Sequence, residues 1–159
     1  MKFLKTHYGR AINVIPSDTV NIPNPAGLGT TGVTDGTSVD KLVDSTANFT
    51  TNLLGAIVVN TTSQAIANVI GFTNNTKLIL DADIFVSGED YAIYNSDNNQ
   101  GCALYIPAGT PAPLRVLTVG GDIIKFKDCG DANASTILPV NVLRVIKSDT
   151  DINNLIALW

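Results

Sequence analysis

The pattern that most constrains this chain is a run of alternating apolar residues from 114 to 127, interrupted by Gly120-Gly121. Two glycines between two apolar-rich runs indicate a two-residue β-hairpin turn, because both central positions of the favoured turn need a positive φ. Ile124 and Phe126 share one face of the second run, and the lysines that follow each of them share the other. This period of two predicts a hairpin whose strands have one face on a core.

The same third of the chain contains two more strand candidates. Residues 140–146, VNVLRVI, place Val142 and Val145 on opposite faces, which suits a strand at the margin of a sandwich, and Pro139 marks where it starts or bends. The segment at 155–159, LIALW, ends at the single Trp. An apolar terminal segment gains nothing from exposure to water, so we expect it to be a core strand or to be buried against a partner.

The composition favours strands along the whole chain. Charged residues are 15% of the 159, against about 25% in a typical domain, whereas Thr, Asn, Ile, Val and Gly are abundant. Further strand candidates lie at residues 10–15, 56–60, 65–72, 77–80, 91–94 and 102–106. We therefore predict an all-β fold with few and short helices.

Changes in the character of the sequence predict two modules. Residues 1–26 together with 97–159 are expected to form a discontinuous, β-sandwich-like base. Residues 27–96 are expected to form an inserted small β-barrel module, because short strands and Asn- and Thr-rich turns follow one another there. The glycine-rich stretch at 27–36, GLGTTGVTDG, lacks the Lys of a phosphate-binding loop, so we interpret it as a flexible connector.

Charge and hydropathy exclude some classes of partner. The net charge is −4 and no basic run is present that could neutralise a series of phosphates, so we expect no nucleic-acid partner. No apolar run approaches the roughly 20 residues that a membrane helix needs. The start of the chain, MKFLKTHYGR, lacks the apolar segment of a signal peptide, which predicts synthesis in the cytoplasm.

No pattern in the sequence indicates a catalytic, cofactor-binding or metal site. The acidic spots at 81–83 and 149–153 lack parts of a calcium loop, including its glycine. Cys102 and Cys129 have no CxxC spacing, so we expect two reduced, half-buried thiols, with a disulfide formed after release as the alternative. We expect no enzyme, although carboxylates that meet only in the folded chain leave that class open.

Five segments, taken together, resemble the head spike base family of tailed phages and gene transfer agents. These segments are PSDT (16–19), GCALYI (101–106), LRVLTVGGDIIKF (114–126), ILPVNVLRV (137–145) and DINNLIALW (151–159). They cover about half of the chain in the family's order. Lys147-Ser148-Asp149 depart from the Thr and Gly usual before the last strand, and the middle module is an addition.

The middle module has a likeness of its own. The segments LVDSTANF, IVVNTTS and DADIFVSGEDYAIY are similar to a β module that recurs in phage structural proteins. This second resemblance also implies a virion setting.

The resemblances imply a non-enzymatic virion structural protein, made in the cytoplasm of the host bacterium and placed on the capsid surface. It would be a capsid decoration (cement) protein or the base of a head spike or head fibre protein, bound to the major capsid protein as a homo-oligomer, a trimer or a pentamer. The alternative is a tail or fibre adhesin module that binds a host surface glycan. The residues expected at an oligomer or capsid interface are Lys2, Phe3, Lys5, Tyr8, Arg10, Leu155, Ile156, Leu158 and Trp159.

Overall fold

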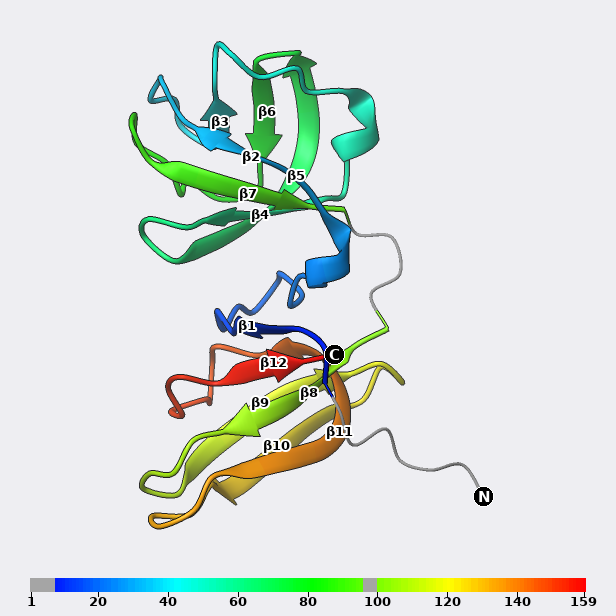
Figure 1. The fold of residues 1–159 in the computed structure, drawn as a ribbon, viewed down its shortest axis with the longest axis vertical. Helices are drawn as coiled ribbons and strands as arrows, with labels where there is room; N and C mark the ends of the chain where they lie inside the picture. Colours follow the sequence, from blue (N-terminus) through cyan, green and yellow to red (C-terminus); the bar gives the residue numbers. More distant parts are fainter. Residues whose placement is uncertain (1–7, 96–99) are drawn as a thin grey trace. The chain divides into compact units, whose positions relative to one another are not determined.

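The computed structural model of the chain describes residues 8–95 and 100–159 and is built almost entirely of antiparallel strands (Figure 1). The predicted all-β class is therefore confirmed. Two short 3-10 turns, η1 (Pro25–Gly27) and η2 (Thr51–Leu53), are the helical elements among the described residues.

The chain divides into two compact units. Unit 1 joins Met1–Pro25 with Gln100–Trp159, and unit 2 is Ala26–Asn99. The sequence predicted the first junction one residue later, between residues 26 and 27. It predicted the second junction three residues earlier, between residues 96 and 97.

Unit 1 contains one six-stranded sheet that draws its strands from both ends of the chain. The order across the sheet is β1-β12-β8-β11-β9-β10. Its strands are β1 (Ala11–Asn13), β8 (Cys102–Ile106), β9 (Ala112–Thr118), β10 (Ile123–Cys129), β11 (Thr136–Val145) and β12 (Ile156–Leu158).

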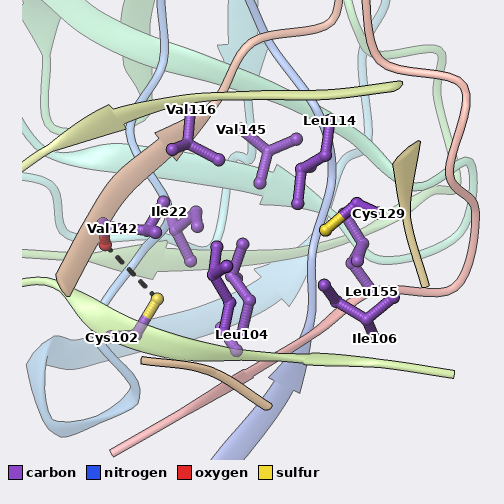
Figure 2. Close-up of a cluster of buried hydrophobic side chains, with 12 residues drawn as sticks. Ile22, Cys102, Leu104, Ile106, Leu114, Val116, Cys129, Val142, Val145 and Leu155 are labelled. Carbon is purple, nitrogen blue, oxygen red and sulfur yellow. Dashed lines mark hydrogen bonds between the residues drawn. The ribbon is translucent and has the colours of Figure 1, made fainter. Parts of the chain in front are cut away.

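The long strand β11 bends this sheet into a sandwich-like shape. Its first half pairs with β8, its second half pairs with β9, and the register shifts between Leu138 and Val142. Pro139 lies within the shift, where the absence of its N–H removes no ladder bond. Leu104 of β8 and Val116 of β9 are fully buried and point toward one another across the core (Figure 2). The predicted sandwich-like base is thus present in unit 1.

A second irregularity in β11 makes the regular alternation predicted for residues 140–146 wrong. The register shifts again between Val142 and Arg144. As a result Val142 and Val145 are both fully buried, whereas a regular strand would place them on opposite faces.

The hairpin predicted around Gly120-Gly121 is confirmed as β9–β10, with a longer turn than expected. The Thr118 N–H donates to the Asp122 carbonyl at 2.9 Å, so four residues lie between the strand ends. Gly121 has a φ of 90° and Gly120 has no positive φ. Only one of the two glycines therefore uses the conformation that the two-residue turn would have required of both.

Unit 2 contains the other six-stranded sheet, in the order β2-β7-β4-β5-β6-β3. Its strands are β2 (Leu28–Val33), β3 (Lys41–Val43), β4 (Ile57–Asn60), β5 (Ala65–Asn74), β6 (Lys77–Leu80) and β7 (Asp90–Tyr94). Just beyond β2, the Asp35 N–H donates to the Val43 carbonyl of β3 at 3.1 Å. This bond joins the two edges of the curled sheet and makes it a small, partly closed barrel. The glycine-rich stretch at 27–36 is therefore largely strand, and its interpretation as a flexible connector was wrong.

Because each unit has its own hydrophobic core, we predict that each folds without the other. A chain in which a Gly-Ser linker joins residue 25 to residue 100 should unfold in one cooperative thermal transition. Its NMR amide signals should overlay on the unit 1 signals of the full chain. The separate segment 26–99 is the matched control. A linked chain that only aggregates would contradict the division.

Candidate functional site

The pairing of β1 with β12 brings the two ends of the chain together. The Gly9 N–H donates to the Trp159 carbonyl at 2.7 Å, and the Trp159 N–H donates to the Arg10 carbonyl at 3.0 Å. On its other side β12 pairs with β8, so the terminal strand lies inside the sheet. Expected interface residues from the two termini are thus neighbours in unit 1.

Beside this pairing lies an apolar groove of about 500 Å³, which we call the terminal groove. No side chain that lines it is charged. The larger side chains that line it belong to Tyr8, Ile137, Pro139, Val140, Leu158 and Trp159. An apolar hollow at a protein surface is a common place for a partner or a ligand to bind.

Eight of the nine expected interface residues fall into three groups, and Arg10 is described separately below. Tyr8, Leu158 and Trp159 line the terminal groove. Leu155 is 1% exposed and belongs to the core of unit 1, and the partly buried Ile156 pairs with Asn13 and Tyr105, so neither residue lines the groove. Lys2, Phe3 and Lys5 lie outside the described residues.

Arg10 is exposed and has an internal partner. Its guanidinium donates to the Pro25 carbonyl at 2.7 Å. It thus holds the end of the first segment of unit 1 and does not line the terminal groove.

Sequence reasoning missed Ile137, Pro139 and Val140 as groove residues. They reach the groove because the first half of β11 pairs with β8, which in turn pairs with β12. The signal that the sequence offered was the apolar segment ILPV next to a proline that marks a bend. In the structure, Ile137 of that segment is 44% exposed.

The Trp159 side chain, which lines the groove, has one unpaired polar atom. Its Nε1 atom is buried and has no hydrogen-bond acceptor among the residues that the structure describes. Buried N–H groups are nearly always paired, because an unpaired donor loses its water without compensation. The Trp159 ring therefore lines the groove while its N–H lies buried without an acceptor among the described residues.

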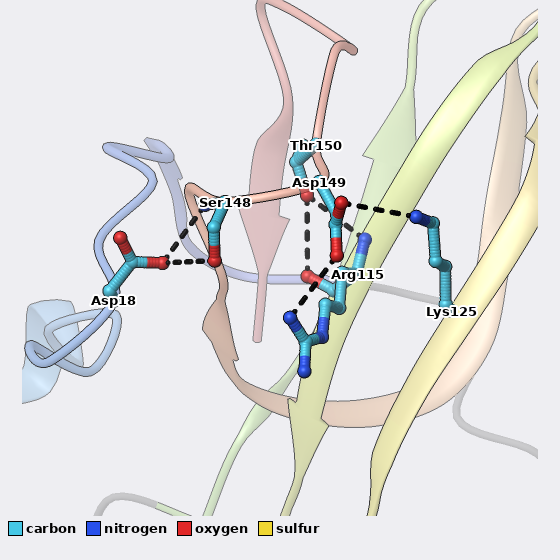
Figure 3. A network of polar contacts seen from close by, with 6 residues as sticks. All are labelled: Asp18, Arg115, Lys125, Ser148, Asp149 and Thr150. Carbon is cyan, nitrogen blue, oxygen red and sulfur yellow. Dashed lines mark hydrogen bonds and ion pairs between the residues drawn. The ribbon is translucent and has the colours of Figure 1, made fainter.

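A polar network holds the loop before β12 (Figure 3). The Ser148 N–H and hydroxyl both donate to Asp18, at 2.9 and 2.8 Å. These two bonds hold the pKa of the exposed Asp18 carboxyl below its ordinary value. Asp149 pairs with Arg115 and with Lys125, each at 3.2 Å, and has a φ of 69°. Of the residues that depart from the family pattern, Ser148 thus binds the PSDT segment and Asp149 binds the β9–β10 hairpin.

Neither acidic spot assembles a metal site in the described part of the chain. No group of three or more His, Cys, Asp or Glu side chains is close enough there to hold an ion. Asp149 already faces two cations, and Asp81 accepts the N–H and the side-chain amide of Asn68.

Both cysteines are free thiols in the core of unit 1, more deeply buried than expected. Burial raises the pKa of Cys102 to about 12 and raises that of Cys129 as well. The Cys102 thiol donates to the Val142 carbonyl at 3.4 Å. A thiol with a raised pKa holds little thiolate at neutral pH, so both side chains have the properties of packing residues.

Unit 2 has a polar hollow of about 450 Å³ between β2 and residues 44–53. Asp44 lies at its base, where the Tyr91 hydroxyl and the Thr46 N–H donate to its carboxylate at 2.7 and 2.9 Å. A Cβ on Gly32 would lie 2.5 Å from the Tyr91 hydroxyl oxygen, so the β2 backbone can approach this pair only at a glycine. Thr and Asn side chains supply most of the remaining lining.

Hydrogen bonds change the pKa of Asp44 more than burial does. Burial by itself would raise the pKa of this carboxyl, but the bonds from Thr46 and Tyr91 leave the pKa below its ordinary value. Burial and the Asp44 carboxylate both raise the pKa of Tyr91. The pair is therefore a carboxylate that accepts from a neutral phenol at neutral pH.

Comparison with known proteins gives no assignment, because no family model, no curated protein and no solved structure matches this chain. Within the described residues, no helix has the length and apolar character needed to cross a membrane.

We predict that Tyr91→Phe lowers the free energy of unfolding by about 1–3 kcal/mol, because it removes a donor from the buried Asp44 carboxylate. Urea unfolding, followed by the amide signals of unit 2, measures the loss. Tyr94→Phe is the matched control, since the Tyr94 hydroxyl has no hydrogen bond to another described residue. Equal effects of the two substitutions would show that the Asp44–Tyr91 bond contributes nothing specific.

We also predict that unit 2 loses stability in acid through Asp44. A carboxyl whose folded-state pKa is lowered stabilises the fold above its ordinary value of 3.8, and the contribution is lost as the pH falls through the lower value. Asp44→Asn should flatten that dependence. Unfolding measured from pH 6 down to about 2 provides the comparison, and identical pH profiles of the two proteins would contradict the assignment.

Deletion of residues 155–159 should unfold unit 1 and leave unit 2 folded. The deletion removes β12 and so leaves both β1 and β8 without a partner on that side. It also removes Leu155 and Ala157 from the core. The milder Leu155→Ala should cost about 2–5 kcal/mol. NMR of the truncated chain tests this, with the unit 2 signals as the internal control; a soluble oligomer of unchanged size would refute it.

Proposed function

We propose that this protein is a non-enzymatic structural component of a phage-type virion. It would lie on the capsid surface as a decoration (cement) protein or as the base of a head spike or head fibre protein. Its partners would be the major capsid protein and further copies of itself, in a trimer or a pentamer. The protein would be made in the cytoplasm of the host bacterium.

One observation carries the proposal: all five segments that resemble the head spike base family lie in unit 1 and pack together there. GCALYI contains β8, LRVLTVGGDIIKF contains most of the β9–β10 hairpin, and ILPVNVLRV lies in β11. The closing segment supplies β12, and Asp18 of PSDT binds the loop before it. Segments scattered along the sequence therefore make one folded body, as a shared fold would require.

The separate core of unit 2 fits the same proposal. The resemblance to the spike base family omits the middle of the chain, and that middle is a compact unit by itself. A module inserted into a base leaves the base intact if both have their own cores, as they do here. The terminal groove offers unit 1 an apolar surface for attachment.

The alternative, a tail or fibre adhesin that binds a host surface glycan, is favoured by the polar hollow of unit 2. Its Thr and Asn side chains and the Asp44 carboxylate could bond to sugar hydroxyls. The two aromatic residues that line it, Phe49 and Tyr91, are 4% and 2% exposed. They offer no exposed ring on which a sugar could stack, so we rank this function second.

Binding to particles tests the first proposal. Purified labelled protein, mixed with heads that lack it, should sediment with the heads and not with isolated tails of the same phage. Saturation at a fixed ratio to the major capsid protein would indicate symmetric sites. Sedimentation with tails alone would refute a head location. Binding of the isolated protein on a glycan array would support the adhesin.

A further inference from the structure

We infer that the polar hollow of unit 2 receives an extended polypeptide segment of a partner protein, which pairs with the free edge of β2 as an additional strand. The segment would have small side chains and no acidic residue. Such a site goes beyond the proposed function, since it belongs to unit 2 and does not depend on what unit 1 attaches to. The hydrogen bonding of β2 and the residues that line the hollow carry the inference.

The outer edge of β2 faces the hollow because β3 ends early. β2 is at the end of the strand order of unit 2, with β7 on its inner side. The bond between Asp35 and Val43 reaches the outer side just beyond β2. The chain then turns at Asp44, whose carboxylate accepts the Thr46 N–H at 2.9 Å. No described strand therefore pairs with the outer side of β2, and the hollow lies beside residues 29–32.

Backbone groups on this edge have no partner. The Thr61 N–H donates to the Asp90 carbonyl at 2.9 Å, so Asp90 of β7 directs its carbonyl toward β4 and away from β2. Val33, which lies opposite Asp90, and Thr31, two residues earlier, therefore direct their N–H and C=O groups away from β7. No other described residue forms a hydrogen bond with these groups. They are free to bond to a further strand.

The strand β2 also lacks the side chains that protect exposed edges. Lysine deters a sheet edge from pairing with another chain, and β10 carries Lys125 and Lys127. Likewise β3 begins with Lys41. β2 has no charged residue, and its register shift lies between Leu28 and Thr30, before the outward-facing groups. This edge is therefore open to a further strand.

The hollow leaves room for a backbone against the edge. Its volume is about 450 Å³, and Gly29 and Gly32 of β2 present no side chain to it. The opposite wall, residues 46–50, contributes small side chains apart from the buried Phe49. Paired strands lie about 4.8 Å apart, so a segment paired with β2 lies between the two walls. Its side chains that point toward the opposite wall are expected to be small.

The chemistry of the edge favours a polypeptide over a sugar and over an acidic segment. The N–H and C=O of Thr31 match the C=O and N–H of a single opposite residue in a strand. The aromatic residues of the lining are buried, so no ring is exposed for a sugar to stack on. Asp44 is the one charged residue among the described residues that line the hollow, and no described cation pairs with it. A second carboxylate would be repelled there.

Amide hydrogen exchange in the full chain tests the pairing. The probes are a panel of synthetic peptides, acetylated and amidated, in which Thr or Ser alternates with Val or Ala and one position is Lys. A peptide that binds should slow exchange of the Thr31 and Val33 amides by about tenfold or more. The Thr34 amide already donates to the Glu89 carbonyl and should change little. The same peptides with N-methyl groups along the backbone keep their side chains, lose strand pairing and should not bind.

Variants at position 31 separate backbone pairing from side-chain contact. Thr31→Pro removes the outward N–H and breaks no bond to β7, and Thr30 lies in a strand, the conformation that a residue before proline prefers. This variant should weaken peptide binding by about tenfold or more and leave the other amide signals of unit 2 in place. Thr31→Ala is the matched control, because it keeps the N–H and should leave the affinity nearly unchanged. The N-methylated peptides test the same bonds if Thr31→Pro fails to fold.

Other occupants of the hollow give different results, each of which would overturn the inference. One is that no peptide of the panel protects the Thr31 and Val33 amides at the highest soluble concentration. Loss of binding in Thr31→Ala with retention in Thr31→Pro would indicate recognition of the hydroxyl, as by a glycan. Protection of both amides that rises with protein concentration, without peptide, would show that two β2 edges pair with each other. Sedimentation with heads is measured separately, so retained head binding would leave the proposed function standing in every case.

Discussion

The antiparallel pairing of β12 with β1 on one side and β8 on the other holds unit 1 together. β12 contributes one buried residue, Ala157, and Leu155 immediately before it is also buried. It joins the first segment of the unit to the segment that follows unit 2. Without β12, the first segment would be joined to the last by few hydrogen bonds. These include the side-chain bonds Asp18–Ser148 and Asn21–Arg144 and the backbone bonds close to them. The terminal groove exists only because this pairing brings Tyr8 beside Trp159.

Unit 2 relies on a different kind of constraint. Its sheet nearly closes on itself, and the buried Asp44–Tyr91 bond ties the turn after β3 to β7 beneath β2. Gly32 allows the β2 backbone to pass next to that pair. The hollow depends on this arrangement, since a larger residue at position 32 would displace Tyr91, which lines it together with Asp44.

The sequence predicted the elements that depend on local pattern. Strands β6 and β8 have the bounds that alternation and turn residues indicated, and Gly120-Gly121 marked the right hairpin. The prediction failed where the structure of a segment depends on residues that are distant in the sequence. The stretch that contains β2 was interpreted as a connector because it is rich in glycine and lacks the signature of a phosphate-binding loop. The reason for Gly32 lies at Tyr91, which is far away in sequence.

The candidate site was predictable only in part, for the same reason. Alternation identified an apolar terminal segment, and it could not show that Leu155 faces the core while Leu158 and Trp159 line a groove. Ile137 and Pro139 enter that groove through the register of β11 on β8, including the shift at the proline. A register shift changes which residues face a core, and no local pattern fixed its position.

The central proposal is that unit 1 associates with further copies of itself on the surface of a particle. The mass of the full chain in solution, measured by light scattering after size exclusion, tests this most directly. We expect the mass of a defined trimer or pentamer. A monomer at every concentration would contradict the proposal.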